Sequence, residues 1–320
     1  MNRKPIIIVP GQINSVFFEI FFKSLKIKDF ISPLVLICDF RIFKKNAKKF
    51  KFKNKFKLIN SINEISRLKN KTVNVFNVNL KRKKKDNLGL KYEKDYTIDC
   101  FETAFNILEK KISLKFLNGP INKKKILNKK FIGITEYISE FFNQKKTGML
   151  IYNNNLSVSP LTTHLPIKLI AKQITKKQVY NRIKLINNFF IKNFKIKPKI
   201  GVTGLNPHCE SILPINEDET IISPAIELAK KNGIKVNGPH SADTIFLNQN
   251  RVKFDVILGM YHDQVLTPIK TLYEYDAINV TMGLPFLRVS PDHGPNEKMI
   301  NKNKSNPISL QKCLEFLDKN

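Results

Sequence analysis

The sequence feature that most constrains the fold is the alternation of short β-branched runs with longer segments of helical periodicity. Such alternation is typical of βαβ units, so we predict an α/β fold with a mostly parallel sheet covered by helices on both faces. The expected strands are 5–9, 33–38, 72–76, 148–152, 198–205, 255–260 and 277–283. The expected helices are 103–112, 134–145, 165–174, 177–194 and 224–233. The segment 40–97 shows no clear period, because basic runs interrupt it.

The length of 320 residues is large for one hydrophobic core, so two domains sharing a cleft are expected. No apolar run approaches the roughly 18 residues of a membrane span, and the apolar start is too short for a signal peptide. We therefore expect a cytoplasmic protein with no membrane partner. The four cysteines are far apart and form no C-x-x-C pair, which predicts reduced structural thiols.

The net charge of +30 invites comparison with nucleic-acid-binding proteins. However, only seven of the 56 basic residues are arginine, the side chain that reads bases and phosphates in a bidentate way. The lysines accompany abundant Ile, Asn and Phe, a mixture that A- and T-rich codons would produce. We interpret basic runs such as 44–57 and 81–85 as solvated surface, and we predict no specific nucleic-acid partner.

Three histidines occur in polar clusters where strands are expected to end. His164 lies in "LTTHLPIK", His208 in "GVTGLNPHCE" and His262 in "ILGMYHDQ". In open α/β sheets ligands bind outside the carboxyl ends of the strands, so these imidazoles can converge. Each histidine alone is more often a hydrogen-bonded loop residue. Together they suit a divalent transition metal with open positions for a substrate.

Six motifs in one order resemble the 4-hydroxythreonine-4-phosphate dehydrogenase family of vitamin B6 biosynthesis. The resemblance is dense from about residue 117 to 294 and faint before that. The motifs are "GPINK" (119–123), "TTHLP" (162–166), "GLNPH" (204–208), "NGP" with "SADT" (237–244), "MYHDQ" (260–264) and "NVTMGLPFLRVSPDHG" (279–294).

This resemblance implies a two-domain α/β/α fold like that of isocitrate and isopropylmalate dehydrogenases. It implies a homodimer with its site at the subunit interface, and NAD or NADP bound without a G-x-G-x-x-G fingerprint. We place the first domain at 1–125 plus about 285–320 and the second at about 126–284, with the active-site cleft between them.

The resemblance also assigns roles to individual residues. It implies that His164, His208 and His262 hold one divalent ion, which could be zinc, magnesium or cobalt. It implies substrate contacts from Thr135, Lys270, Asn279 and Arg288, and catalytic roles for Lys270 and Asp243.

Two residues beside His262 and the two remaining histidines complete this assignment. Asp263 and Gln264 would orient the ligand His262, and a helix N-cap is the alternative role for Asp263. We interpret His240 as a surface loop residue. His293 matches the family motif without a role that its position reveals.

The chain departs from the family pattern at several positions. Ile134 replaces a histidine, Val265 replaces a glycine, and Pro295 and Asn296 replace small residues. Of the N-terminal glycine-rich signature, the segment 11–19 clearly keeps only its first and last residues. A β-branched side chain replaces glycine poorly where φ is positive, so an altered substrate or weakened activity is an open alternative.

The implied reaction is oxidation of 4-phosphooxy-L-threonine and decarboxylation to 3-amino-2-oxopropyl phosphate. One alternative keeps this chemistry but acts on a related four-carbon hydroxy acid, such as threonate or erythronate 4-phosphate. The other is a basic binding protein that has lost most of its catalytic activity.

Overall fold

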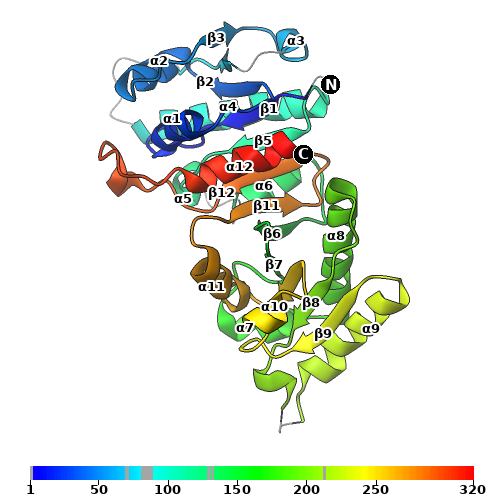
Figure 1. Ribbon diagram of the computed structural model, residues 1–320. Coiled ribbons are helices and arrows are strands. Elements are labelled where there is room, and N and C mark those ends of the chain that lie inside the picture. The colour runs from blue at the N-terminus through cyan, green and yellow to red at the C-terminus, as the bar shows by residue number, and fades with distance from the viewer. Residues whose placement is uncertain (1–2, 69–71, 81–88, 128–130, 132, 212–213) are drawn as a thin grey trace. The chain divides into compact units, whose positions relative to one another are not determined.

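The structure is a computed structural model that describes residues 3–68, 72–80, 89–127, 131, 133–211 and 214–320 (Figure 1). The basic run predicted at 81–85 lies outside these residues. The chain divides into two compact units. Unit 1 comprises residues 1–143 and 284–320, and unit 2 comprises residues 144–283.

Unit 1 is built on a parallel sheet with the strand order β3-β4-β2-β1-β5-β12. The central strands are continuous apolar runs, as expected for strands that are buried on both faces. The strands are β1 (Ile6–Val9), β2 (Leu34–Cys38), β3 (Phe56–Ile59), β4 (Val73–Asn77), β5 (Lys115–Asn118) and β12 (Leu287–Pro291).

Helices cover both faces of this sheet (Figure 1). Helix α1 packs against α12, while α4 packs against β1 and β2. Between α4 and β5, the rings of Phe101 and Phe105 on α4 and Phe116 on β5 form a buried aromatic cluster. The helical elements are α1 (Phe17–Ile27), α2 (Phe40–Lys49), α3 (Ile62–Ile65), α4 (Gly89–Glu109), α5 (Lys123–Ile126), α6 (Ile134–Phe141), η3 (Glu297–Met299) and α12 (Ile308–Lys319).

Unit 2 has a mixed sheet with the strand order β11-β6-β7-β10-β8-β9. Strand β6 is antiparallel to both of its neighbours, whereas β7, β10, β8 and β9 are parallel. The strands are β6 (Gly148–Tyr152), β7 (Ser157–Pro160), β8 (Ile200–Thr203), β9 (Val236–His240), β10 (Val256–Gly259) and β11 (Ile278–Met282).

The helices of unit 2 flank its parallel strands. Helix α8 packs against α9, and α11 packs against β7 and β10 (Figure 1). The helical elements are α7 (Ile167–Gln173), α8 (Lys176–Phe194), η1 (Pro207–Cys209), η2 (Asp218–Ile222), α9 (Ser223–Lys231), α10 (Asn248–Arg251) and α11 (His262–Tyr273).

The predicted fold class is confirmed, because both units are helix-flanked and their sheets are mostly parallel. All seven predicted strands and all five predicted helices are present, with shifted ends. The predicted free thiols are also confirmed, and Cys38, Cys100 and Cys313 are buried. None of the helices in the described part of the chain is long and apolar enough to span a membrane.

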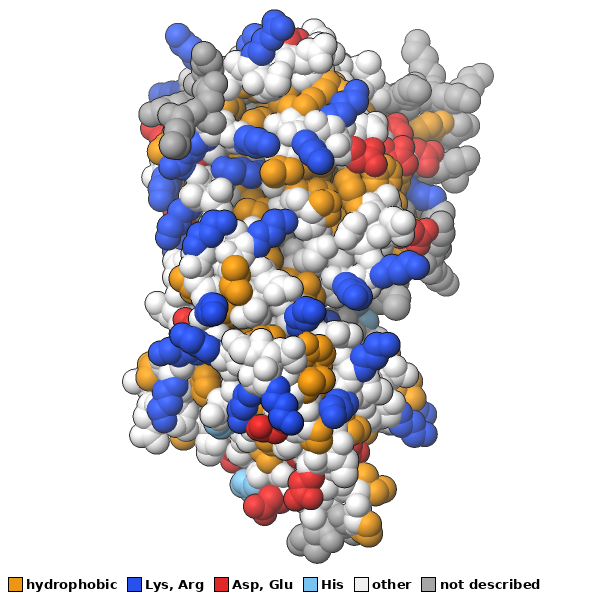
Figure 2. Space-filling view, turned by 90° about the vertical axis from the view of Figure 1, so that its right-hand side faces the viewer, with side chains coloured by type: hydrophobic (Ala, Val, Ile, Leu, Met, Phe, Trp, Pro, Cys, Tyr) orange, Lys and Arg blue, Asp and Glu red, His pale blue; other side chains and the backbone are white. Residues whose placement is uncertain are grey.

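Lysine and arginine side chains are scattered over the molecular face shown in Figure 2. They alternate there with polar and apolar side chains instead of forming one continuous basic patch. On this face the distribution is what solvated charges produce.

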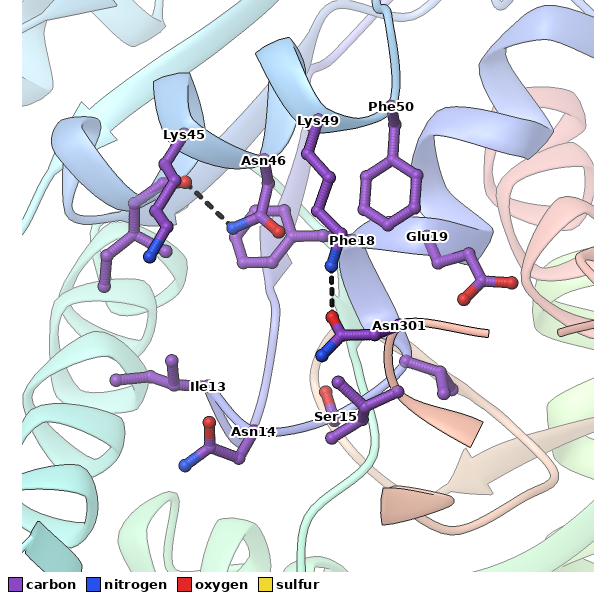
Figure 3. A pocket seen from close by; sticks show the side chains of 13 residues that line it. Ile13, Asn14, Ser15, Phe18, Glu19, Lys45, Asn46, Lys49, Phe50 and Asn301 are labelled. Atoms are coloured by element: carbon purple, nitrogen blue, oxygen red, sulfur yellow. Dashed lines mark hydrogen bonds between the residues drawn. The ribbon is translucent and has the colours of Figure 1, made fainter. Parts of the chain in front are cut away.

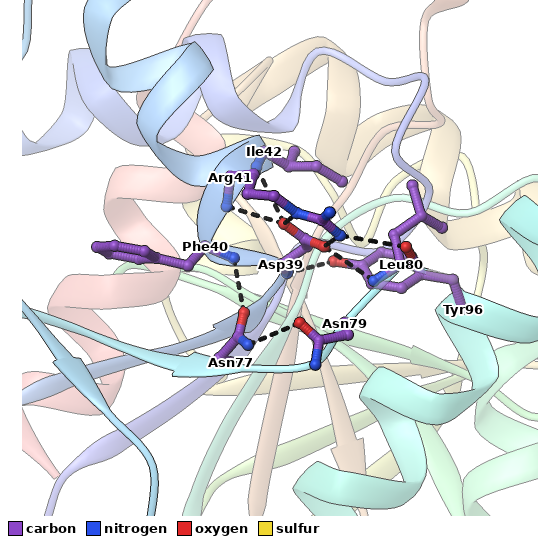
Figure 4. A network of polar contacts seen from close by, with 8 residues as sticks. All are labelled: Asp39, Phe40, Arg41, Ile42, Asn77, Asn79, Leu80 and Tyr96. Carbon is purple, nitrogen blue, oxygen red and sulfur yellow. Dashed lines mark hydrogen bonds and ion pairs between the residues drawn. The ribbon is translucent and has the colours of Figure 1, made fainter. Parts of the chain in front are cut away.

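A polar network at the carboxyl ends of β2 and β4 centres on Asp39, whose side chain is 1% exposed (Figure 4). Asp39 caps α2 by accepting hydrogen bonds from the backbone of Arg41, and it pairs with the Arg41 guanidinium at 2.6 Å. It also accepts a bond from Leu80 N at 2.9 Å, while Tyr96 Oη accepts one from Asp39 N at 2.6 Å. The network therefore joins α2, the segment after β4 and α4.

This network predicts a pH dependence of stability. Burial raises the pKa of Asp39, but the bonds from Arg41 and Leu80 outweigh burial and leave the pKa at about 2. A carboxyl whose folded pKa is depressed stabilises the fold above its unfolded pKa of roughly 4, and this contribution disappears as the pH falls toward 2. We expect Asp39→Asn, which keeps the cap, to lower the free energy of unfolding at pH 7 by about 1–3 kcal/mol. In urea denaturation the difference from the unmodified protein should shrink between about pH 4 and pH 2, and a constant difference would contradict this role.

Candidate active site

Three neighbouring parallel strands of unit 2 each lead to one of the predicted metal ligands. In the order β7-β10-β8, His164 follows β7, His262 is the first residue of α11 after β10, and His208 lies in η1 after β8. Since parallel strands end at the same edge of a sheet, the three histidines occupy one edge.

The imidazoles are accessible at this edge but do not form a closed cluster. His164 and His208 are exposed, and the side chain of His262 is 38% exposed. Within the residues that the structure describes, no group of three or more His, Cys, Asp or Glu side chains is close enough to hold a metal ion. This edge thus carries three imidazoles that could each bind a metal ion, but within one chain they are not close enough to share the same ion.

The loop that carries His208 is held by a buried carboxylate that the sequence did not reveal. Asp218 is 1% exposed and accepts hydrogen bonds from Leu205 N at 2.7 Å and Asn206 N at 3.1 Å. Gly204 gives room for this contact, because a Cβ there would lie 2.7 Å from Asp218 Oδ1. His208 itself has φ 56°, a left-handed conformation that histidine adopts more readily than most residues.

Gln264 and Asp263 organise the start of α11 in different ways. Gln264 joins the ends of β8 and β10, because its Oε1 accepts from Thr203 Oγ1 at 2.8 Å and from Met260 N at 2.7 Å. Asp263 Oδ1 lies 2.6 Å from His262 Nδ1, a contact that orients the ring and leaves Nε2 as the outward donor atom. The N-cap of α11 is Tyr261, so the alternative role of Asp263 as N-cap is wrong.

Arg182 of α8 supports the end of β7 before His164. Its Nη1 donates to Pro160 O at 2.9 Å and its Nη2 to Leu161 O at 3.3 Å. Burial lowers the pKa of Arg182 to about 10. No local sequence signal indicates this role, because one arginine within an amphipathic helix is usually a surface residue.

The other predicted residues of unit 2 lie on three different elements. Asp243 follows β9 and is exposed, Lys270 lies in the last turn of α11, and Asn279 lies on β11. A hydrogen bond from Ser241 Oγ at 2.6 Å lowers the pKa of Asp243, and the nearby His208 lowers it further. An ionised carboxylate of this kind attracts cations and is a weak base at neutral pH.

Two predicted substrate contacts, Thr135 and Arg288, lie together in unit 1. Arg288 on β12 is 1% exposed, with Nε donating to Asn118 Oδ1 at 2.8 Å and Nη1 to Thr135 Oγ1 at 3.4 Å. Burial lowers the pKa of Arg288 to about 10, so the guanidinium remains charged at neutral pH. Asn118, at the end of β5, was not among the predicted site residues.

The departures from the family pattern have structural reasons. Ile134 packs against the apolar core of unit 1, where an imidazole would be poorly solvated. Val265 is fully buried inside α11 and fills the space above Gly259, so the expectation of strain from a positive φ at this position is wrong. The interpretation of His240 as a surface loop residue is also wrong, because it ends β9, is partly buried and contacts the Phe254 ring.

A cavity of about 330 Å³ opens at the carboxyl ends of β1 and β2 in unit 1 (Figure 3). Its wall combines apolar side chains with two lysines of α2, Lys45 and Lys49, and Lys49 Nζ donates to Asn301 Oδ1 across the opening. The segment 13–16, within the altered N-terminal signature, forms another part of the wall. Gly11 precedes it with φ 80°, and a Cβ there would lie 2.4 Å from Pro120 O.

Comparison with known proteins identifies the family of this chain. The model of the family described as pyridoxal phosphate biosynthetic protein PdxA matches residues 29–317. The 4-hydroxythreonine-4-phosphate dehydrogenase of Wigglesworthia glossinidia brevipalpis is 34% identical over 99% of this chain and 96% of its own length. The protein of the same name from Sulfurihydrogenibium sp. is 40% identical, over 66% of this chain and 66% of its own length, just under two thirds.

The same name recurs among solved structures. The 4-hydroxythreonine-4-phosphate dehydrogenase of Klebsiella pneumoniae has a TM-score of 0.84 at 25% identity, covering 98% of this chain and 97% of that one. The fold and the strand-end histidines define an α/β protein that presents nitrogen ligands at the carboxyl edge of a parallel sheet. The chain belongs to the PdxA family, which the names of these relatives place among the dehydrogenases.

Proposed function

We propose that this protein oxidises 4-phosphooxy-L-threonine with NAD or NADP and a divalent metal ion. The oxidised product then loses carbon dioxide to give 3-amino-2-oxopropyl phosphate, as part of vitamin B6 biosynthesis. The observation that carries the proposal is the placement of three imidazoles at the ends of three adjacent parallel strands, within a chain of the PdxA family.

The donor set suits a divalent metal ion such as zinc, cobalt or magnesium, although imidazole favours the first two. When bound, the ion would lower the pKa of the substrate hydroxyl and stabilise the negative charge that develops on that oxygen. The Asp263 carboxylate fixes the ring of His262 at 2.6 Å, and Asp218 fixes the loop of His208. These contacts would hold the His262 ring and the His208 loop in place before a metal ion binds.

Because no single chain assembles the three ligands, we propose that a homodimer completes the site with histidines from both copies. The exposure of His164 and His208 supports this, since ligands shared between subunits must reach the surface of each chain.

The cavity of Figure 3 is a suitable place for one half of the nicotinamide cofactor. Its volume of about 330 Å³ is at the lower end for ligand sites, so it would hold a mononucleotide portion. The apolar wall would contact a ring, while Lys45 and Lys49 would face the phosphates. A nicotinamide bound there would supply the acceptor for a hydride from the substrate carbon that bears the hydroxyl.

We assign the remaining charges to binding and orientation of the substrate. Lys270 and Arg288 would pair with its phosphate and carboxylate groups, with Thr135 and Asn279 as hydrogen-bond partners. Asp243, with its depressed pKa, would attract the substrate ammonium group rather than remove the hydroxyl proton.

The proposal is tested by following NADH or NADPH formation with added zinc, cobalt or magnesium. The substrates are 4-phosphooxy-L-threonine and the 4-phosphates of threonate and erythronate, which lack the amino group. We expect a higher kcat/KM for the amino acid, because Asp243 stays ionised and complements the ammonium group. Ile134 lies where relatives have a histidine, so a preference for threonate 4-phosphate would show that the pocket serves a different substrate. Turnover of none of the three would overturn the proposal.

A further inference from the structure

Unit 2 contains a second cavity, away from the predicted ligands, that the proposed reaction does not use. Its volume is about 490 Å³. Its lining comes from the starts of β8 and β9, the residues just before β10, and His240 at the end of β9, and it includes none of the three predicted metal ligands. Its lining residues are Lys199, Ile200, Lys235, Val236, Asn237, His240, Lys253 and Phe254.

The cavity has an apolar floor and a basic rim. The Phe254 ring lies over Gly201, where a Cβ would be 3.1 Å from ring atoms, and the buried Ile200 and Val236 extend this surface. Lys199, Lys235 and Lys253 are exposed around it. Lysine and arginine account for 56 of 320 residues, so eight lining residues would contain one or two by composition. The lining contains three lysines.

The charges of the rim are available to a ligand. Among the described residues, none of the three lysines forms an ion pair. The nearby Asp255 carboxylate accepts a hydrogen bond from the backbone N of Lys199 at 2.7 Å, and Lys253 Nζ reaches Asn250 Oδ1 only at 3.4 Å. An anion would therefore meet several ammonium groups that have no carboxylate partner.

His240 adds a second aromatic ring to the lining of the cavity. Its imidazole lines the cavity and contacts the Phe254 ring at 5.3 Å between centroids. Its Nε2 is buried and has no hydrogen-bond partner in the described part of the chain.

We propose that this cavity binds a small molecule that carries a phosphate group on a flat ring. The ring would lie against Phe254 and His240, and the phosphate would face Lys199, Lys235 and Lys253. Nucleotides and phosphorylated pyridines share this chemistry. The site is separate from the proposed reaction and does not depend on it.

Lysine footprinting tests the proposal one residue at a time. The protein is acetylated with a water-soluble ester, and mass spectrometry gives the labelling rate of each lysine. The probes are AMP, pyridoxamine 5′-phosphate, which has no aldehyde to react with lysine, and inorganic phosphate. At about ten times its Kd, a ring phosphate should slow the labelling of the three rim lysines about tenfold, by the factor 1 + [L]/Kd. Lys176 and Lys177, exposed at the start of α8, are the reference lysines.

Variants of the rim lysines then test whether their protection from acetylation reflects binding of the probe. Lys199→Gln combined with Lys235→Gln should raise the Kd of the protecting probe roughly tenfold or more, because two charge-assisted contacts are lost. Lys176→Gln with Lys177→Gln removes the same charge and should leave the Kd unchanged. Equal protection by inorganic phosphate, or equal protection of the reference lysines, would overturn the proposal. So would binding of single-stranded nucleic acid alone, with neither ring phosphate protecting the rim.

Discussion

Replacing His208 by asparagine should abolish turnover and release the metal ion while the protein stays folded. Asparagine is the appropriate change, because His208 has φ 56° and asparagine tolerates this left-handed conformation better than alanine. Residues that only orient a metal ligand are worth about 10- to 100-fold in affinity or activity, so loss of a ligand should cost at least about 100-fold. Turnover and metal content after dialysis provide the measurement, with thermal unfolding as the check on folding.

His240→Asn is the matched control, since this histidine contacts Phe254 and is not among the proposed ligands. It should retain the metal ion and the activity. Mixing His208→Asn with His262→Asn addresses the shared site, because a mixed dimer would keep one intact site if the two ligands come from different copies. Full activity of His208→Asn without metal supplementation would show that His208 is not a metal ligand.

Strands that are covered on both faces of the sheet and rich in β-branched residues were predicted well from the sequence. Strands β1, β2 and β10 are covered on both faces and read as continuous β-branched runs. Strands β3, β5, β7, β9 and β12 were missed. In β7 and β12, "SVSP" and "LRVSP" place polar residues or proline at three of four and three of five positions. Both are nevertheless buried, since the tertiary packing overrides their weak intrinsic preference.

Helices α1 and α2 show a different limit of sequence analysis. The phenylalanine-rich "FFEIFFKSLKI" of α1 lacks the usual polar face, because most of the helix is buried. The basic α2 lies within the segment that showed no clear period, although Asp39 gives it a good N-cap. Helix α1 depends on packing, and α2 depends on a network with Leu80 and Tyr96 for which the local sequence has no signal.

The residues of the candidate site could be predicted where they come directly after a strand. The residues that hold those positions in place could not. The strand-end positions of His164, His208 and His262 follow from a rule that applies to all parallel sheets. Asp218 lies 13 and 12 residues after Leu205 and Asn206, whose backbone it holds, and Arg182 lies within a long helix. Their roles depend on three-dimensional proximity, which no spacing in the sequence reveals.

The second large effect is expected at Arg288, where replacement by lysine keeps the charge but removes the planar fork. Arg288 is 1% exposed and holds Asn118 at 2.8 Å and Thr135 at 3.4 Å, two contacts that one ammonium group cannot reproduce with the same geometry. A hydrogen bond to a charged group is worth about 1.5–3 kcal/mol, so kcat/KM for the phosphorylated substrate should fall roughly 10- to 100-fold.

Substrate affinity separates a binding role of Arg288 from a purely structural one. If the guanidinium binds or positions the substrate, Arg288→Lys should raise the substrate Kd in calorimetry as well as lower kcat/KM. If it serves only the core, the free energy of unfolding should fall by about 1–3 kcal/mol, since Asn118 loses its donor, while Kd stays the same. Arg41→Lys is the control in the same unit, because the Arg41 side chain is 71% exposed and pairs with Asp39 instead. An unchanged Kd together with reduced stability would assign Arg288 to the fold, leaving Lys270 as the one proposed cationic contact of the substrate.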